Sequence, residues 1–102
     1  MKRYCIELRG KNFLLNFDGE PRRFGFSLVR YLRAADEATA EKTAVIQARQ
    51  LPALKQGLSN ESEDPPLISL VRISEVNPIV FALRQKKLHF ELSAEEEPLP
   101  QP

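Results

Sequence analysis

The sequence predicts an α+β domain, a two-layer sandwich in which one main helix covers one face of an antiparallel sheet of four to five strands. Three observations support this prediction. Apolar and polar residues alternate along several stretches, which is the period of a strand with one buried face. One stretch after Ala35 instead carries small apolar residues at helical spacing. Short turn signals separate the strands before it, so the expected order of elements is β-β-β-α-β-β.

The first strand is expected over residues 4–9, where apolar and polar side chains alternate. Gly10 and Lys11 predict a turn, and a second alternating stretch over residues 12–17 predicts the returning strand. Residues 18–21, which read DGEP, are a strong turn signal because glycine tolerates a positive φ and proline presets its own φ. A hairpin is therefore expected to precede the central strand.

The central strand is expected over residues 24–34. One face carries five apolar residues and a single charge, Arg30, and this face is expected to be buried. The apolar residues are Phe24, Phe26, Leu28, Leu32 and Ala34.

The main helix is expected to begin at Asp36, because a carboxylate at the N-cap can accept a hydrogen bond from a free backbone N–H group. Ala40, Ala44 and Ala48 recur every four residues, which indicates a helix that lies close to the sheet. Pro52 predicts the end of the helix.

The chain after the helix is expected to return to the sheet. Residues 57–64 read GLSNESED and predict a surface loop, and residues 67–76 predict a strand. Residues 79–83 are compatible with a strand or with a helical turn. A final strand is expected around residues 88–92.

The domain organisation is expected to be simple, with a single domain over residues 1–93 and a disordered acidic, proline-rich tail over residues 94–102. The net charge of +1 argues against a dominant electrostatic interface for nucleic acid. Cys5 is the only cysteine, which excludes an intramolecular disulfide. No apolar stretch is long enough to span a membrane and no secretion signal is recognised, so a cytoplasmic location is expected.

One combination of motifs extends from the hairpin to His89-Phe90. It comprises Gly25-Phe26, Arg30-Tyr31 and Ala34 in the strand, Ala40-Glu41 and Ala44 in the helix, and Asp64-Pro65-Pro66 before a strand that ends Ile73-Ser74-Glu75-Val76. In this combination the chain resembles a small family of uncharacterised bacterial proteins. The resemblance implies a compact α+β domain with no assigned activity, and it transfers no catalytic residue. The element order also resembles that of antitoxin domains with a truncated ribonuclease-H-like fold, although their glycine-rich turn is missing.

Arg30 is the most unusual residue, because it is a charge on a face that otherwise reads as buried. A buried guanidinium requires a partner, and Glu7 and Glu75 are the candidate carboxylates. The alternative is that Arg30 forms an anion-binding site for a phosphate or a carboxylate. In that case the chain would be an enzyme that holds an anionic substrate through Arg30.

Other candidate residues predict no chemistry. Cys5 and His89 could form a nucleophilic pair only if the first and last strands were neighbours, and nothing in the sequence supplies an oxyanion hole. The spacing of residues matches no metal site and no cofactor motif, so no catalytic, cofactor-binding or metal-binding residue is expected. The arginines around Phe24 and Phe26 are interpreted as solvated, and nucleic acid is not expected as a partner.

The remaining signal is an excess of apolar residues on the sheet face away from the helix. One helix covers one face, and an uncovered apolar face is typical of a subunit interface. We therefore expect a non-enzymatic, homodimeric binding domain, with an antitoxin-like nucleic-acid-associated regulator as the alternative. The expected interface residues are Val29, Tyr31, Leu14, Ile68 and Leu70.

Overall fold

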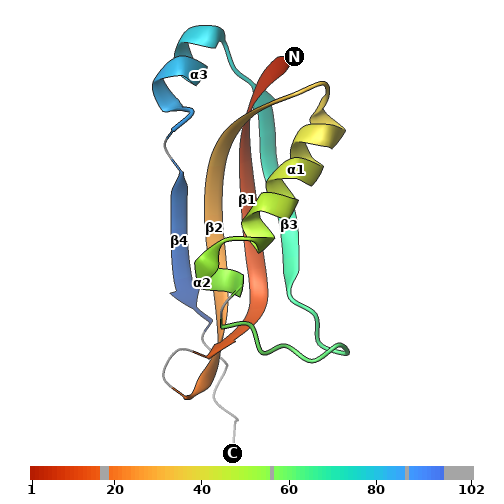
Figure 1. Ribbon diagram of the computed structural model, residues 1–102, viewed down its shortest axis with the longest axis vertical. Coiled ribbons are helices and arrows are strands. Elements are labelled where there is room, and N and C mark those ends of the chain that lie inside the picture. The colour runs from red at the N-terminus through yellow and green to blue at the C-terminus, as the bar shows by residue number, and fades with distance from the viewer. Residues whose placement is uncertain (17–18, 56, 87, 96–102) are drawn as a thin grey trace, which may run out of the picture.

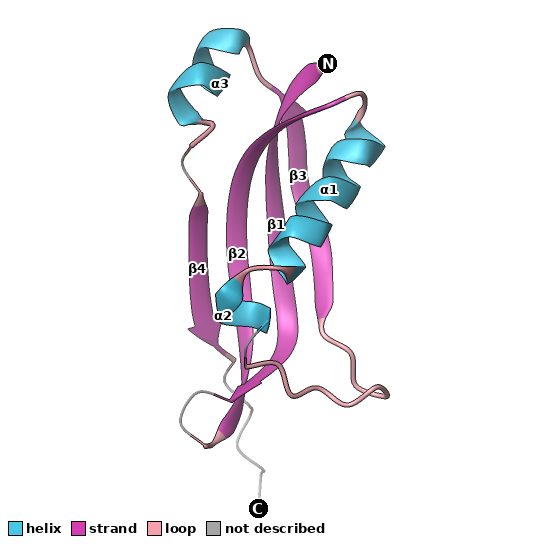
Figure 2. Ribbon diagram, viewed as in Figure 1, coloured by secondary structure: helices cyan, strands magenta, loops and turns pink. Residues whose placement is uncertain are grey.

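The computed structural model describes residues 1–16, 19–55, 57–86 and 88–95. It shows an α+β fold in which four antiparallel strands form one sheet and one main helix crosses one face (Figures 1 and 2). The elements are β1 (Lys2–Asn16), β2 (Pro21–Ala34), α1 (Glu37–Arg49), α2 (Pro52–Lys55), β3 (Leu67–Glu75), α3 (Pro78–Arg84) and β4 (His89–Ala94). The strand order in the sheet is β3-β1-β2-β4. We call the sheet face opposite α1 the open face.

The expected hairpin over residues 4–17 is wrong, because β1 is one long strand without a turn at Gly10. The pairing of β1 with β2 instead shifts register between Gly10 and Phe13, which is a β-bulge. Asn12 adopts a φ of 62° there. The physical reason is visible in the burial: even-numbered residues face the core up to Gly10, and odd-numbered residues do so from Phe13 onward. The bulge keeps both halves of β1 buried on the same side.

The predicted core face of β2 is confirmed: Phe26, Leu28, Leu32 and Ala34 are buried, and Phe24 packs partly against them. Five aromatic and aliphatic residues of β1 lie in the same cluster as these side chains. They are Tyr4, Ile6, Leu8, Phe13 and Leu15.

The main helix follows the prediction. The Asp36 side chain accepts a hydrogen bond from the backbone N of Thr39 at 2.7 Å, so it caps α1. Ala40, Ala44 and Ala48 are buried against the sheet. Their short side chains let α1 lie close across β1, β2 and β3 (Figure 1).

Residues 79–83, which the sequence left open between strand and helix, belong to α3. Asn77 caps this helix by accepting a hydrogen bond from Val80 N at 2.8 Å, and Pro78 occupies its first turn. Phe81 is its buried residue. The ring of Phe81 lies near Arg3 and Arg33, which alternate with the core residues of β1 and β2. α3 therefore packs on the open face, at the end of the sheet.

β4 continues to Ala94, one residue past the predicted end of the domain, and Glu95 N donates a hydrogen bond to Arg23 O at 2.9 Å. The rest of the expected disordered tail, residues 96–102, lies outside the described residues. No described helix is long and apolar enough to cross a membrane.

Candidate functional site

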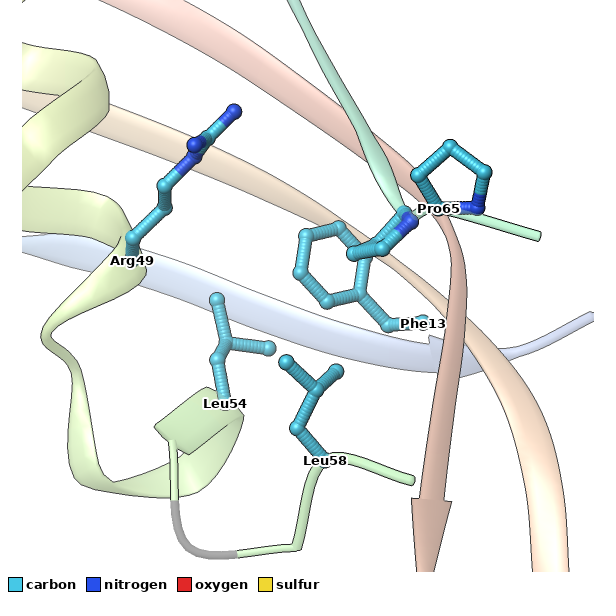
Figure 3. Close-up of a pocket in the computed structure, with 6 residues that line it drawn as sticks. Phe13, Arg49, Leu54, Leu58 and Pro65 are labelled. Atoms are coloured by element: carbon cyan, nitrogen blue, oxygen red, sulfur yellow. The ribbon is translucent and has the colours of Figure 1, made fainter. Parts of the chain in front are cut away.

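A half-open cavity of about 230 Å³ lies on the side of the sheet that carries α1. Figure 3 shows Leu54 of α2 and Leu58 of the following loop pointing toward Phe13 of β1. Pro65 and Pro66, which precede β3, form the opposite wall, and Arg49 from the end of α1 completes the lining.

The loop that walls this cavity is attached to the bulge of β1 by Asn60. The Oδ1 atom of Asn60 accepts a hydrogen bond from Leu14 N at 2.8 Å. Its Nδ2 atom donates to Asn12 O and to Asp64 O, both at 2.8 Å. One side chain therefore makes hydrogen bonds to three backbone groups, and these bonds attach the loop to β1.

Asp64 extends the same network to β2. Its carboxylate accepts a hydrogen bond from Asn12 Nδ2 at 2.8 Å and forms an ion pair with Arg23 Nη1 at 2.9 Å. Arg23 also donates to the side-chain oxygen of Asn12. The hydrogen bonds from Asn12 and then Arg23 hold the pKa of Asp64 below its ordinary value. Asn12 Nδ2 also donates to Pro65 O at 3.2 Å, which positions one wall of the cavity.

The described lining of the cavity is mainly apolar. Of its six described lining residues, Arg49 alone is ionisable. Within the described ranges, no group of three histidine, cysteine, aspartate or glutamate side chains could hold a metal ion.

Arg30 lies on the core face of β2 and is half-buried. Its predicted ion pair with Glu7 or Glu75 is not found among the described residues, and its Nε atom is buried without a hydrogen-bond partner. Glu7 is the pairing partner of Val29, so it faces the opposite side of the sheet. Anion binding by Arg30 stays a prediction.

The five expected interface residues do not share one surface. Val29 and Tyr31 alternate with buried residues of β2 and lie on the open face, both half-buried. Ile68 and Leu70 pack instead against the core under α1, which corrects their expected position. The reason is that they pair with the inward-facing Gly10 and Leu8.

Leu14, the fifth of these residues, lies beyond the bulge of β1 and is half-buried. Its backbone holds the loop after α2, because Leu14 N donates to Asn60 and Leu14 O accepts from Ser59 N at 2.8 Å. Leu14 alternates with two buried residues and therefore lies on the open face, as Val29 and Tyr31 do, so an interface through these three residues stays a prediction.

The open face is instead largely polar. Its polar residues alternate with buried residues of β1 and β2, or pair with such residues from β3 and β4. They are Glu7, Arg9, Ser27, Arg72 and Glu91. An antiparallel sheet with one packed face and one solvated face has this composition.

Cys5 and His89 are not neighbours. Both lie on the open face, but β2 separates their strands, with Cys5 pairing with Tyr31 and His89 with Val29. His89 Nε2 lies 3.5 Å from Glu91 Oε1, and both side chains are exposed. A Cys–His pair required the first and last strands to be neighbours in the sheet, and they are not.

The structure brings together three arginines that the sequence did not group. At the end of the open face, Arg3 of β1 and Arg33 of β2 lie near the ring of Phe81, and Arg84 of α3 interacts with Tyr31. No sequence signal marks this cluster, because its members come from three distant segments and meet only when α3 folds back onto the sheet.

No protein-family model, curated protein or solved structure matches this chain. The resemblances drawn from its motifs therefore stay predictions, and no activity is transferred from a relative.

Proposed function

We propose that this chain is a non-enzymatic binding domain that self-associates through α3. The observation that supports this proposal is the exposure of two large aliphatic residues, Ile79 at 74% and Leu83 at 73%. They are four residues apart, so they lie on one side of the helix, while Phe81 is buried on another. Exposed apolar side chains that are adjacent on one element are typical of an interaction surface.

A second copy of the chain is the partner that fits this surface. The two ends of α3 differ in charge, since Glu75 precedes the helix and Lys86 follows it, both exposed. Two α3 helices packed antiparallel about a two-fold axis would set Lys86 of each copy near Glu75 of the other. The same axis would place Ile79 of each copy against Leu83 of the other.

The expected association is weak. Burying a leucine or isoleucine side chain stabilises by about 1.5–3 kcal/mol, so four side chains give about 6–12 kcal/mol. Association itself costs about 4–15 kcal/mol in lost rotational and translational freedom. The two ranges overlap, so the net free energy of association is small and self-association is expected only at high protein concentration.

The open face is a poorer candidate for this interface. Two of its five expected residues, Ile68 and Leu70, pack against the core. Val29 pairs with Glu7 on one side and with His89 on the other, so its direct neighbours are polar. Replacing Val29 by lysine distinguishes the two surfaces. We expect Val29→Lys to keep the self-association of the parent, whereas its loss would indicate an interface on the open face.

Sedimentation velocity over roughly 5–500 µM protein tests the proposal. We expect the parent to sediment faster as its concentration rises and the Ile79→Gln/Leu83→Gln variant to remain monomeric. Glutamine removes the apolar surface without adding charge and keeps a good helix propensity. Ile46→Gln is the matched control, because Ile46 is 47% exposed on α1, on the other side of the sheet. A monomeric parent, or a double variant that associates like the parent, would refute the proposal.

A further inference from the structure

Two arginines stand side by side on the open face. Arg3 of β1 and Arg33 of β2 are direct pairing partners in the sheet. Their Cζ atoms lie 6.0 Å and 5.2 Å from the centroid of the Phe81 ring. Because Phe81 is buried, its ring gives both guanidinium groups a fixed apolar support.

Arg84 is the last residue of α3, the helix that carries Phe81. The pKa of Arg84 is raised, first by its hydrogen bond to the Tyr31 side chain. Tyr31 is two residues from Arg33 along β2, so its side chain is on the same face. Arg3 and Arg33 therefore lie at Phe81, and Arg84 lies at Tyr31 on the same face of the sheet.

This arrangement is electrostatically unfavourable by itself. Like charges directly opposite each other on neighbouring strands destabilise a sheet. Within the described ranges, none of the three guanidinium groups forms an ion pair with a carboxylate. Glu7, on the same face of β1, is four residues from Arg3, which is roughly 13 Å along a strand. A bound anion would offset the repulsion between Arg3 and Arg33.

We propose that Arg3, Arg33 and Arg84 form a binding site for the phosphate group of a small phosphorylated molecule. Each guanidinium group can donate two parallel hydrogen bonds to phosphate oxygens, and a phosphate dianion has enough oxygens to contact all three arginines. A small ligand fits the extent of the site, because Arg3 and Arg33 are direct neighbours at one end of the open face.

Calorimetric titration with inorganic phosphate, at constant ionic strength, tests the site. We expect saturable binding in roughly the millimolar range, because the guanidinium groups are accessible to solvent and salt. The Arg3→Gln/Arg33→Gln variant should bind at least about tenfold more weakly. The Arg9→Gln/Arg72→Gln variant is the matched control, since it removes two charges from the open face away from α3 and should stay within about twofold of the parent.

Circular dichroism tests whether each variant is folded. Arg84→Gln changes an exposed residue at the end of α3, and it should also weaken phosphate binding, which provides an independent test if the double variant does not fold. Ile79 and Leu83 are unchanged in all of these proteins, so self-association and phosphate binding fail or succeed separately. Equal weakening in the two double variants, or no saturable binding in the parent, would overturn the proposal. Binding of a single-stranded oligonucleotide without saturable phosphate binding would overturn it in favour of nucleic acid.

Discussion

Replacing Gly10 by alanine tests the aromatic packing at the centre of the sheet. An added Cβ atom at this position would lie 2.0, 2.3 and 2.7 Å from three ring atoms of Phe26. Real Cβ atoms do not approach carbon this closely, so the ring must move. The ring cannot move freely, because Phe26 is buried and packs 5.2 Å from Phe13 and 5.5 Å from Phe90, measured between ring centroids.

The magnitude follows from these contacts. Overpacking of a buried site costs about 1–3 kcal/mol, and each disturbed aromatic pair loses up to about 0.5–1.5 kcal/mol. Alanine regains about 0.5–1 kcal/mol over glycine in a strand. We therefore expect Gly10→Ala to lower the free energy of unfolding by about 2–4 kcal/mol, a large part of the roughly 5–15 kcal/mol typical of a domain this size.

Urea denaturation followed by circular dichroism measures this loss, and Phe26→Leu supplies the matched background. With a typical urea slope, the Gly10→Ala midpoint should fall by roughly 1–2 M. In the Phe26→Leu background the same substitution should cost less than about 1 kcal/mol, because the ring atoms that obstruct the new methyl group are gone. The reasoning is refuted if Gly10→Ala is neutral, or if it costs the same in both backgrounds.

Three further predictions concern the helix and the loop. Asp36→Ala should lower the urea midpoint at pH 7, because it removes the N-cap of α1. The hydrogen bonds with Thr39 hold the folded-state pKa of Asp36 below its ordinary value of 3.8, so the difference between the two proteins should shrink as the pH falls through that lowered pKa. A difference that is independent of pH would contradict the capping role. Asn60→Ala should cost about 1–3 kcal/mol and accelerate hydrogen exchange at the Leu14 amide, and unchanged exchange would show that the loop is held by other contacts. Ala44→Leu should lower the free energy of unfolding by about 1–3 kcal/mol, because the larger side chain pushes α1 away from the sheet. Ala38→Leu, at an exposed position of the same helix, is the control and should be nearly neutral. Equal effects of the two substitutions would refute the close packing.

The main helix could be predicted in detail because its signals are local. A carboxylate at Asp36 and alanines every four residues act within one or two turns of chain, so no distant contact is needed to interpret them. The core face of β2 could be predicted for the same reason, since alternation along a strand reports which side is buried.

The bulge of β1 could not be distinguished from a turn by the same reasoning. Glycine, lysine and asparagine at residues 10–12 suit both a hairpin turn and a bulge, and both interrupt the alternation. The deciding fact is the pairing on either side of the interruption: Gly10 pairs with Phe26 and Phe13 with Phe24, on the same neighbouring strand. A change from even to odd buried positions was the available signal for a bulge.

The candidate sites depended still more on tertiary contacts. Asn12, Asn60 and Asp64 are separated by up to 52 residues, and each is an ordinary loop or strand residue in the sequence. The arginine cluster joins Arg3 to Arg84 only through the position of α3. Side chains that meet from distant segments leave no periodic pattern that sequence reasoning could detect.

The sequence by itself therefore determined the α+β class, the capped alanine-rich helix and the buried face of the central strand. These features depend on capping and periodicity, which act between residues a few positions apart. Only the tertiary structure decided that β1 is one bulged strand, that Ile68 and Leu70 face the core, and that α3 packs on the open face. The physical reason is that strand register and helix docking are set by contacts between distant segments, whose energies are not expressed in any local pattern.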